Sequence, residues 1–321
     1  MTAAARDRFE QMKGRLRLPV IAAPMFLVSG LELVQAARGA GVIGSFPFPN
    51  CRTLEQLESW LDSICGAPEG LPPFAANMIT HSTYDRLEGE LALVRRYRPE
   101  MVITALGGPR PVIDTVHDYG GLVLADVNSV PYARKAVEAG ADGLVLVSAG
   151  AGGHTGNMSP FAFVSAVREF FDGIVVLAGS IATGRAVRAA EMLGADLAYI
   201  GTGFIAARES LAPDPYRQML AEAAYEDLVA SSAFTGAEAN YLRQSLEAAG
   251  YDPAQIRAGR KPDFGDTQAS IKAWRDLWSA GHAVGLVRDS RPASEIVDRL
   301  VAEYRDACAT MPWPSAIPVS P

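Results

Sequence analysis

The sequence predicts an α/β protein of the (β/α)8 TIM-barrel class with a helical insertion after the eighth strand. Eight short apolar runs alternate with longer amphipathic segments between residues 19 and 201, which is typical of parallel strands joined by helices. The runs are apolar throughout, as expected where both faces of a parallel strand are buried. Loops that contain glycine follow the last three runs, at 150–156, 179–180 and 201–203.

A doubly wound open sheet is the alternative arrangement for alternating strands and helices. Such a sheet binds a dinucleotide through a GxGxxG loop directly after its first strand. This chain has no such motif there, and its glycines follow the sixth, seventh and eighth strands instead. The position of the glycines therefore favours the closed barrel.

The predicted barrel elements follow one another with short connections. The strands occupy residues 19–22, 42–45, 74–77, 101–104, 122–125, 143–148, 174–178 and 197–201. Apolar residues at helical spacing predict helices at 31–38, 54–64, 84–98, 111–119, 131–139, 160–171 and 184–193. Pro111, Pro131 and Pro160 stand in first turns, where helices tolerate proline. Gly140 and Gly194 are expected to end two helices in the left-handed conformation.

The pattern changes after the eighth strand. Three helical stretches, around 216–228, 238–249 and 271–278, follow one another with no convincing strand between them. The chain then returns through 281–287 to a final helix at 293–307, and a proline-rich tail begins at residue 311. We therefore expect a barrel at 1–209, a helical insertion or lid at 210–272, and a return to the barrel with its tail at 273–321.

Composition and charge exclude several classes of protein. The net charge of −7 argues against nucleic acid or an anionic membrane surface as the main partner. The cysteines, at positions 51, 65 and 308, form no CxxC pair, which predicts a reducing compartment and no structural zinc. The first 17 residues lack the apolar core of a signal peptide, and no segment reaches the length of a membrane span. We expect a cytoplasmic protein without a metal site.

Two loops near the end of the predicted barrel carry glycine together with a hydroxyl. Gly179-Ser180 follows the seventh strand and Gly201-Thr202 follows the eighth. Barrels of this class bind phosphate at that place, through backbone amides, hydroxyls and a short helix. We therefore expect a phosphate site there. The structural alternative is a pair of tight turns that need glycine for backbone reasons alone.

The loop after the sixth strand contains four glycines and one histidine. Gly152 and Gly153 let backbone amides approach a ligand closely, because no Cβ stands in the way. His154 is the side chain of this loop that exchanges a proton near neutral pH. We expect it to act as a general base or as a hydrogen-bond donor to a developing anion. A loop histidine bonded to a carbonyl is the structural alternative.

The remaining histidines are weaker candidates. His81 follows the loop after the third strand, and a position that faces the pocket is one interpretation. His282 lies in a second turn flanked by glycines, and contact with a cofactor is one interpretation of that position. His117 is expected in the middle of a helix, at the surface.

Polar or soft side chains also stand where other strands end. Asn77 offers an amide that suits the edge of a heteroaromatic ring, or it caps a loop. Asp126 accepts a ring N–H, or it caps the helix that begins near Pro131. Pro24 and Met25 are expected to place backbone atoms and a thioether against the ring of a ligand. The alternative for Met25 is that its side chain only packs in the apolar core.

With these motifs the chain resembles the nitronate monooxygenase family, formerly called 2-nitropropane dioxygenases, over nearly its whole length. The motifs that carry the resemblance are AAPM at 22–25, Asn77, AGAGGHTG at 149–156, AGSI at 178–181 and IGTGF at 200–204. Members of this family are FMN-dependent (β/α)8 barrels with a helical insertion. The resemblance therefore implies FMN as the cofactor.

The resemblance also implies a role for each matching position. His154 matches the family's catalytic histidine. Together with Asp126, the residues expected to bind FMN are Ala23, Pro24, Met25, Asn77, Gly152, Gly153, Gly179, Ser180, Gly201 and Thr202. The chain departs from the family pattern at Asp126, where many members have glutamine or lysine, and at His282, where many have glutamine.

The activity that the resemblance implies is the oxidation of alkyl nitronates, and of nitroalkanes, by O2 to carbonyl compounds and nitrite. The expected substrate is then a small planar anion. For the oligomeric state, a homodimer is one interpretation. An NAD(P)H-dependent FMN reductase of quinones or enoyl thioesters is the alternative on the same fold. A flavin-binding protein without catalysis is another. A phosphosugar isomerase or aldolase needs a catalytic lysine or glutamate at a strand end, and we find none there.

Overall fold

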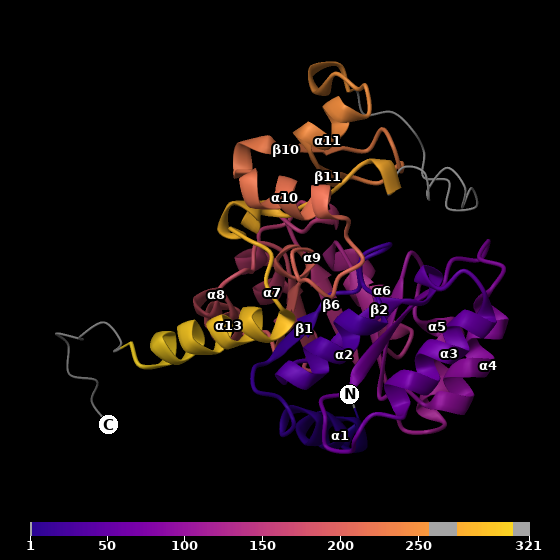
Figure 1. Cartoon of the computed structure of the whole chain (residues 1–321). Coiled ribbons are helices and arrows are strands. Elements are labelled where there is room, and N and C mark those ends of the chain that lie inside the picture. Colours follow the sequence, from indigo (N-terminus) through magenta and orange to yellow (C-terminus); the bar gives the residue numbers. More distant parts are fainter. Residues whose placement is uncertain (1, 257–274, 311–321) are drawn as a thin grey trace.

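The computed structural model describes residues 2–256 and 275–310. Eight parallel strands form one sheet in the order β1-β9-β8-β6-β5-β4-β3-β2. A bridge between Ile21 and Ile43 joins the two edge strands, since Ala22 N donates to Ile43 O (2.8 Å) and Ile43 N donates to Val20 O (3.0 Å). The sheet therefore closes into the predicted barrel, with helices around it (Figure 1).

All eight predicted strands and the seven connecting helices are confirmed, with ends that differ by up to three residues. The strands are β1 (Val20–Ala22), β2 (Gly44–Pro47), β3 (Phe74–Ile79), β4 (Met101–Ala105), β5 (Leu122–Val127), β6 (Gly143–Val147), β8 (Ile174–Ala178) and β9 (Leu197–Ile200). The helices are α2 (Leu31–Ala40), α3 (Leu54–Cys65), α4 (Leu87–Tyr97), α5 (Arg110–His117), α6 (Val130–Glu138), α7 (Pro160–Arg168) and α8 (Gly184–Leu193). The final helix, α13 (Ala293–Cys308), lies against α8 and α2.

A helix that the sequence did not reveal closes the amino-terminal end of the barrel. Helix α1 (Ala3–Lys13) buries Phe9 and Met12. These two side chains join the apolar cluster inside the barrel, beside the first residues of several strands: Met101, Leu122, Ile174 and Leu197. The many charged residues of this segment gave no indication that its apolar side chains are buried. Because α1 fills this end, a ligand has to enter at the carboxyl ends of the strands.

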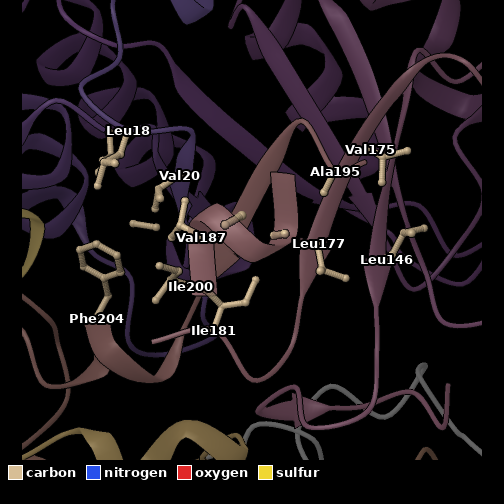
Figure 2. Close-up of a cluster of buried hydrophobic side chains, with 14 of the residues drawn as sticks. Leu18, Val20, Leu146, Val175, Leu177, Ile181, Val187, Ala195, Ile200 and Phe204 are labelled. Carbon is tan, nitrogen blue, oxygen red and sulfur yellow. The ribbon is translucent and has the colours of Figure 1, made fainter. Parts of the chain in front are cut away.

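A second apolar layer lies between the strands and the helices that surround them. Figure 2 shows part of it, with Leu177 of β8 and Ile200 of β9 beside Val187 of α8. Phe204 belongs to the same cluster and lies in the short helix α9 (Thr202–Ile205), which follows β9 directly. Ile181, in the loop after β8, is also part of it. This packing fixes the backbone of the two loops that were predicted to bind phosphate.

The prediction that the insertion is helical throughout is wrong. Strands β10 (Leu228–Ser231) and β11 (Ala239–Leu242) pair in an antiparallel sheet, and β11 also pairs with β7 (Gly153–His154) from the loop after β6. This sheet lies above the barrel, with α10 (Asp214–Glu222) and α11 (Arg243–Ala248) beside it (Figure 1). Pairing between segments far apart in sequence has outweighed local helix propensity. The predicted helix at 271–278 falls largely outside the described residues, as does the tail after residue 310.

Some features concern the molecule as a whole. Cys51, Cys65 and Cys308 are free thiols. Across 2–256 and 275–310, no helix combines the length and the apolar character needed to cross a membrane. The same residues contain no group of three or more side chains arranged to hold a metal ion.

Candidate active site at the carboxyl end of the barrel

The loops after β6, β8 and β9 lie against one another and against the turn before η4 (His282–Leu286). Ser180 N donates to Gly150 O (3.4 Å), and His282 N donates to the same oxygen (3.0 Å). Gly281 N donates to Thr202 Oγ1 (2.9 Å). These contacts bring together the histidine loop and both predicted phosphate loops, which lie far apart in sequence.

Glycine is required for this close packing. Gly150 and Gly179 have φ angles of +87° and +112°, which other residues rarely adopt. A Cβ on Gly179 would lie 2.6 Å from Ser148 Oγ, and a Cβ on Gly152 would lie 2.8 Å from Gly281 N. A larger residue at any of these positions would push two loops apart.

The loop after β1 reaches the same end of the barrel. A Cβ on Gly201 would lie 3.6 Å from Met25 Sδ and 3.8 Å from Ala23 Cβ, so these three predicted residues are neighbours. Ala23 is buried, while Pro24 and Met25 are half-buried. The loop therefore presents small and apolar surface beside the end of β9.

Asn50 holds this loop in place and was missed by the sequence analysis. It ends the short helix η1 (Phe48–Asn50), which follows β2. Its Oδ1 accepts a hydrogen bond from Leu27 N (2.8 Å), and its Nδ2 donates to Met25 O (3.0 Å) and Ser29 O (2.8 Å). No local motif marks such a residue, because its partners lie more than 20 residues away in the chain.

Asn77 and Asp126 lie on inward-facing positions near the ends of β3 and β5. Asn77 is buried, and its Nδ2 donates to Ile103 O (3.2 Å). Asp126 does not cap the next helix, because Ser129 occupies the capping position of α6. Asp126 Oδ1 is buried without a hydrogen-bond partner among the described residues. Burial raises the pKa of this carboxyl to about 7.

A second buried polar group, Tyr199, was missed by the sequence analysis. It lies on β9 at the inward-facing position two residues before Gly201. Its Oη is also buried without a partner within the described part of the chain. A phenol in an otherwise apolar terminal strand was the signal available in the sequence. Burial and the charge of Asp126 raise the pKa of Tyr199, so the two side chains are close enough to interact.

His154 is held by the sheet of the insertion. It lies opposite Ala239 in the pairing of β7 with β11, and the neighbouring Thr155 N donates to Glu238 O (3.0 Å). On the other side of the loop, Asn240 Nδ2 donates to Ala151 O (2.8 Å). The insertion thus fixes the backbone on both sides of the histidine, which no prediction from the sequence anticipated.

The imidazole of His154 is neutral at physiological pH. The ring is half-buried, and desolvation lowers its pKa to about 4. Its Nε2 lies 3.3 Å from Thr235 Oγ1, which itself donates to Ala237 O (3.0 Å). This arrangement favours the tautomer that carries hydrogen on Nε2. A neutral imidazole accepts a proton at one ring nitrogen and donates one from the other.

The other histidines divide between the site and the rest of the molecule. His282 lies at the site, beside Gly150, and its ring meets the ring of Tyr225 edge-on at 4.9 Å. His81 lies in the loop after β3, where its Nδ1 is 2.7 Å from Thr83 Oγ1. His117 is not in the middle of a helix as predicted, since it ends α5 and its Nε2 contacts Asp142 Oδ2 at 2.8 Å.

Comparison with known proteins identifies relatives of this arrangement. The sequence model of nitronate monooxygenase matches residues 74–303, which is more than half of the chain. The nitronate monooxygenase of Neurospora crassa is 31% identical over 227 residues, covering 63% of this chain and 59% of that protein. The (3aS,4S,5R,7aS)-5-hydroxy-7a-methyl-1-oxo-octahydro-1H-indene-4-carboxyl-CoA dehydrogenase of Mycobacterium tuberculosis is 26% identical over 233 residues, covering 71% of this chain.

Both alignments cover less than two thirds of the relatives' own lengths, 59% and 64%. The match with one solved structure extends over nearly all of both chains. The nitroalkane oxidase from Streptomyces ansochromogenes is 25% identical to this chain, with a TM-score of 0.76, and the match covers 92% of this chain and 98% of that one.

Proposed function

This chain belongs to the nitronate monooxygenase family of oxidoreductases, and from that premise we propose that it uses FMN and O2 to oxidise alkyl nitronates to carbonyl compounds and nitrite. The observation that carries the proposal is the convergence of three glycine loops with His154 at the end of the barrel opposite α1. Neutral nitroalkanes are proposed as further substrates.

The residues at this end of the barrel fit a flavin. Asp126 Oδ1 and Tyr199 Oη are buried polar atoms without partners among the described residues, and a ring with polar edges would satisfy them. Ala23 and Gly201 are small, so neither would keep a planar ring away from the backbone beside Met25. When bound, FMN supplies the electron transfer and the reaction with O2.

Backbone amides and hydroxyls support a phosphate site at the ends of β8 and β9. The first hydrogen bond of α9 runs from Phe204 N to Gly201 O (2.8 Å), so the amides of Thr202 and Gly203 lie in the first turn, where a helix offers no acceptor for them. Thr202 Oγ1 accepts from Gly281 N and keeps its own hydrogen to donate. Gly179 and Ser180, in the neighbouring loop, complete the proposed set.

His154 is proposed to handle the proton of the reaction. Because its pKa is lowered to about 4, the imidazole is neutral at pH 7 and is able to accept the α-proton of a neutral nitroalkane. With a nitronate, the same imidazole donates a hydrogen bond to a nitro oxygen, and the negative substrate favours a protonated ring. The bond to Thr235 keeps the ring oriented in both cases.

An NAD(P)H-dependent FMN reductase of an enoyl thioester is the second candidate. Similarity to the carboxyl-CoA dehydrogenase of Mycobacterium tuberculosis, at 26% identity, favours a CoA thioester as the substrate of this candidate. Such a reductase uses the same cofactor site, so the two candidates differ in the compound that delivers electrons.

The visible spectrum of the purified protein separates these possibilities. We expect a flavin spectrum that is bleached anaerobically by a nitronate and not by NADH, and that returns on admission of O2 together with nitrite. Bleaching by NADH without any response to nitronate would replace the proposed reaction with the reductase. A colourless protein that takes up no FMN would contradict both.

A further inference from the structure

Two polar side chains face each other inside the barrel, just above its apolar filling. Asp126 lies on β5 and Tyr199 on β9, and β8 and β6 separate these strands in the sheet. Asp126 continues the inward-facing series of Leu122 and Leu124, and Tyr199 follows Leu197. Both residues are half-buried. They therefore reach from opposite sides into the space below the loops of the active site.

Each of these side chains carries one buried polar atom. Asp126 Oδ1 and Tyr199 Oη are buried, and neither has a hydrogen-bond partner in the described part of the chain. Buried polar atoms in native proteins almost always have a partner. Two unpaired atoms that face the same space indicate a ligand with hydrogen-bonding groups on one edge.

No described positive charge compensates a carboxylate at position 126. The titratable group that faces it is the phenol of Tyr199, and the paired residue on β6 is Val145. Helices α5 and α6 pack against β5, and their charged and titratable residues are exposed: Arg110, Asp114, His117, Tyr132, Arg134, Lys135 and Glu138. Burial is therefore the cause that raises the pKa of Asp126 to about 7.

We propose that Asp126 and Tyr199 form a hydrogen-bonding pair for the polar edge of the flavin ring, and that Asp126 binds this edge as the neutral carboxylic acid. The proposal rests on the proposed function for the identity of the ligand. The pyrimidine edge of the flavin carries carbonyl oxygens and an N–H group. A carboxylic acid both donates and accepts, whereas a carboxylate only accepts and brings a negative charge towards the carbonyl oxygens.

The pH dependence of FMN affinity tests this proposal on the holoprotein. The holoprotein is diluted at a series of pH values between 6 and 9, and released FMN is measured by its fluorescence. We expect the Kd of the wild type to rise about 100-fold from pH 6 to pH 9, because the binding form is lost above a pKa of about 7. In Asp126→Asn, a neutral side chain of the same shape, we expect a change of about threefold or less over this range.

Two further variants serve as controls. Tyr199→Phe removes one hydrogen bond, and we expect it to raise the Kd by about two- to tenfold at every pH without changing the slope. Asp114→Asn removes an exposed carboxylate from the outer face of α5, and we expect it to reproduce the wild-type profile. Ionisations of FMN itself affect all four proteins equally.

The outcomes are distinguishable from those for the proposed function. Equal pH profiles for the wild type and Asp126→Asn would overturn the inference and leave the proposed reaction intact. The expected profiles, together with a failure to oxidise nitronates, would support the inference and contradict the reaction. A protein that binds FMN at no pH would contradict both.

Discussion

The imidazole of His154 owes its pKa to desolvation rather than to a charged neighbour. The form that accepts a proton is the neutral ring, which predominates above a pKa of about 4. We therefore expect kcat/KM for a neutral nitroalkane to fall as the pH drops through about 4, with no inflection near the usual histidine pKa of about 6.5. An inflection near 6.5 that disappears in His154→Asn would contradict this account.

At the scale of single residues, the sequence reveals what depends on local chemistry. The glycine loops and His154 stand directly after strands, so their place at the carboxyl end of the barrel was predictable, while their roles stay predictions. Asn50 and Tyr199 were not predictable in the same way. Asn50 acts through backbone atoms more than 20 residues distant, and the burial of Tyr199 depends on strands that meet only in the folded barrel.

At the scale of elements, the pairing of β7 with β11 connects the insertion to the histidine loop. Asn240→Ala would remove the buried hydrogen bond to Ala151 O. We expect a cost of about 1–3 kcal/mol, a fall in Tm of a few degrees, and faster amide hydrogen exchange in residues 151–156. Asn157→Ala, at an exposed position of the same loop, should leave exchange unchanged. If residues 151–156 exchange at the same rate in Asn240→Ala as in the wild type, this hydrogen bond does not hold the loop.

Helix α1 contributes to the apolar core, although most of its sequence is polar or charged. Phe9 is 3% exposed and packs into the amino-terminal end of the barrel. We expect Phe9→Ala to lower the free energy of unfolding by about 3–5 kcal/mol, measured by urea denaturation. FMN affinity should not change, since the proposed site lies at the opposite end. Phe161→Ala, at a position 66% exposed, is the matched control. If Phe9→Ala unfolds with the same free energy as the wild type, the packing of α1 does not stabilise the barrel.

The elements of the barrel were predictable because each strand is buried on both faces and each helix on one. Such burial requires apolar residues at regular spacing, and this spacing is visible in the sequence. In the insertion, β10 and β11 derive their structure from pairing with each other and with β7. Strand β11 lies within the stretch 238–249 that was predicted to be helical, and β10 lies almost entirely between two predicted helices, where no strand was expected. The error therefore arose where tertiary contacts decide secondary structure.

At the scale of the whole molecule, one buried carboxyl links stability to pH. Glu90 on α4 is fully buried, accepts a hydrogen bond from Tyr84 Oη (2.7 Å) and lies 3.4 Å from Arg86 Nη2. Burial raises its pKa to about 7, above the value of about 4.3 in an unfolded chain. The folded state therefore favours the protonated form, and this stabilisation is present below about pH 4.3 and lost as the pH rises towards 7.

Glu90→Gln should remove this dependence. We expect the free energy of unfolding of the wild type, relative to Glu90→Gln, to decrease by about 3 kcal/mol between pH 4 and pH 8. Urea denaturation at several pH values measures the difference. Glu88→Gln, an exposed glutamate on the same helix, should follow the wild type. A constant difference between wild type and Glu90→Gln would mean that Glu90 titrates normally in the folded protein.

The molecule combines a closed barrel, glycine loops at the carboxyl ends of its strands, and an insertion whose strand β11 pairs with the segment that contains His154, the proposed proton-handling residue. Anaerobic stopped-flow reduction of the flavin in His154→Asn tests this combination most directly, with a neutral nitroalkane and its nitronate compared as substrates. We predict full retention of FMN, a fall of about 100-fold or more in the rate with the nitroalkane, and a fall of less than about tenfold with the nitronate. An undiminished rate with the neutral nitroalkane would contradict the account.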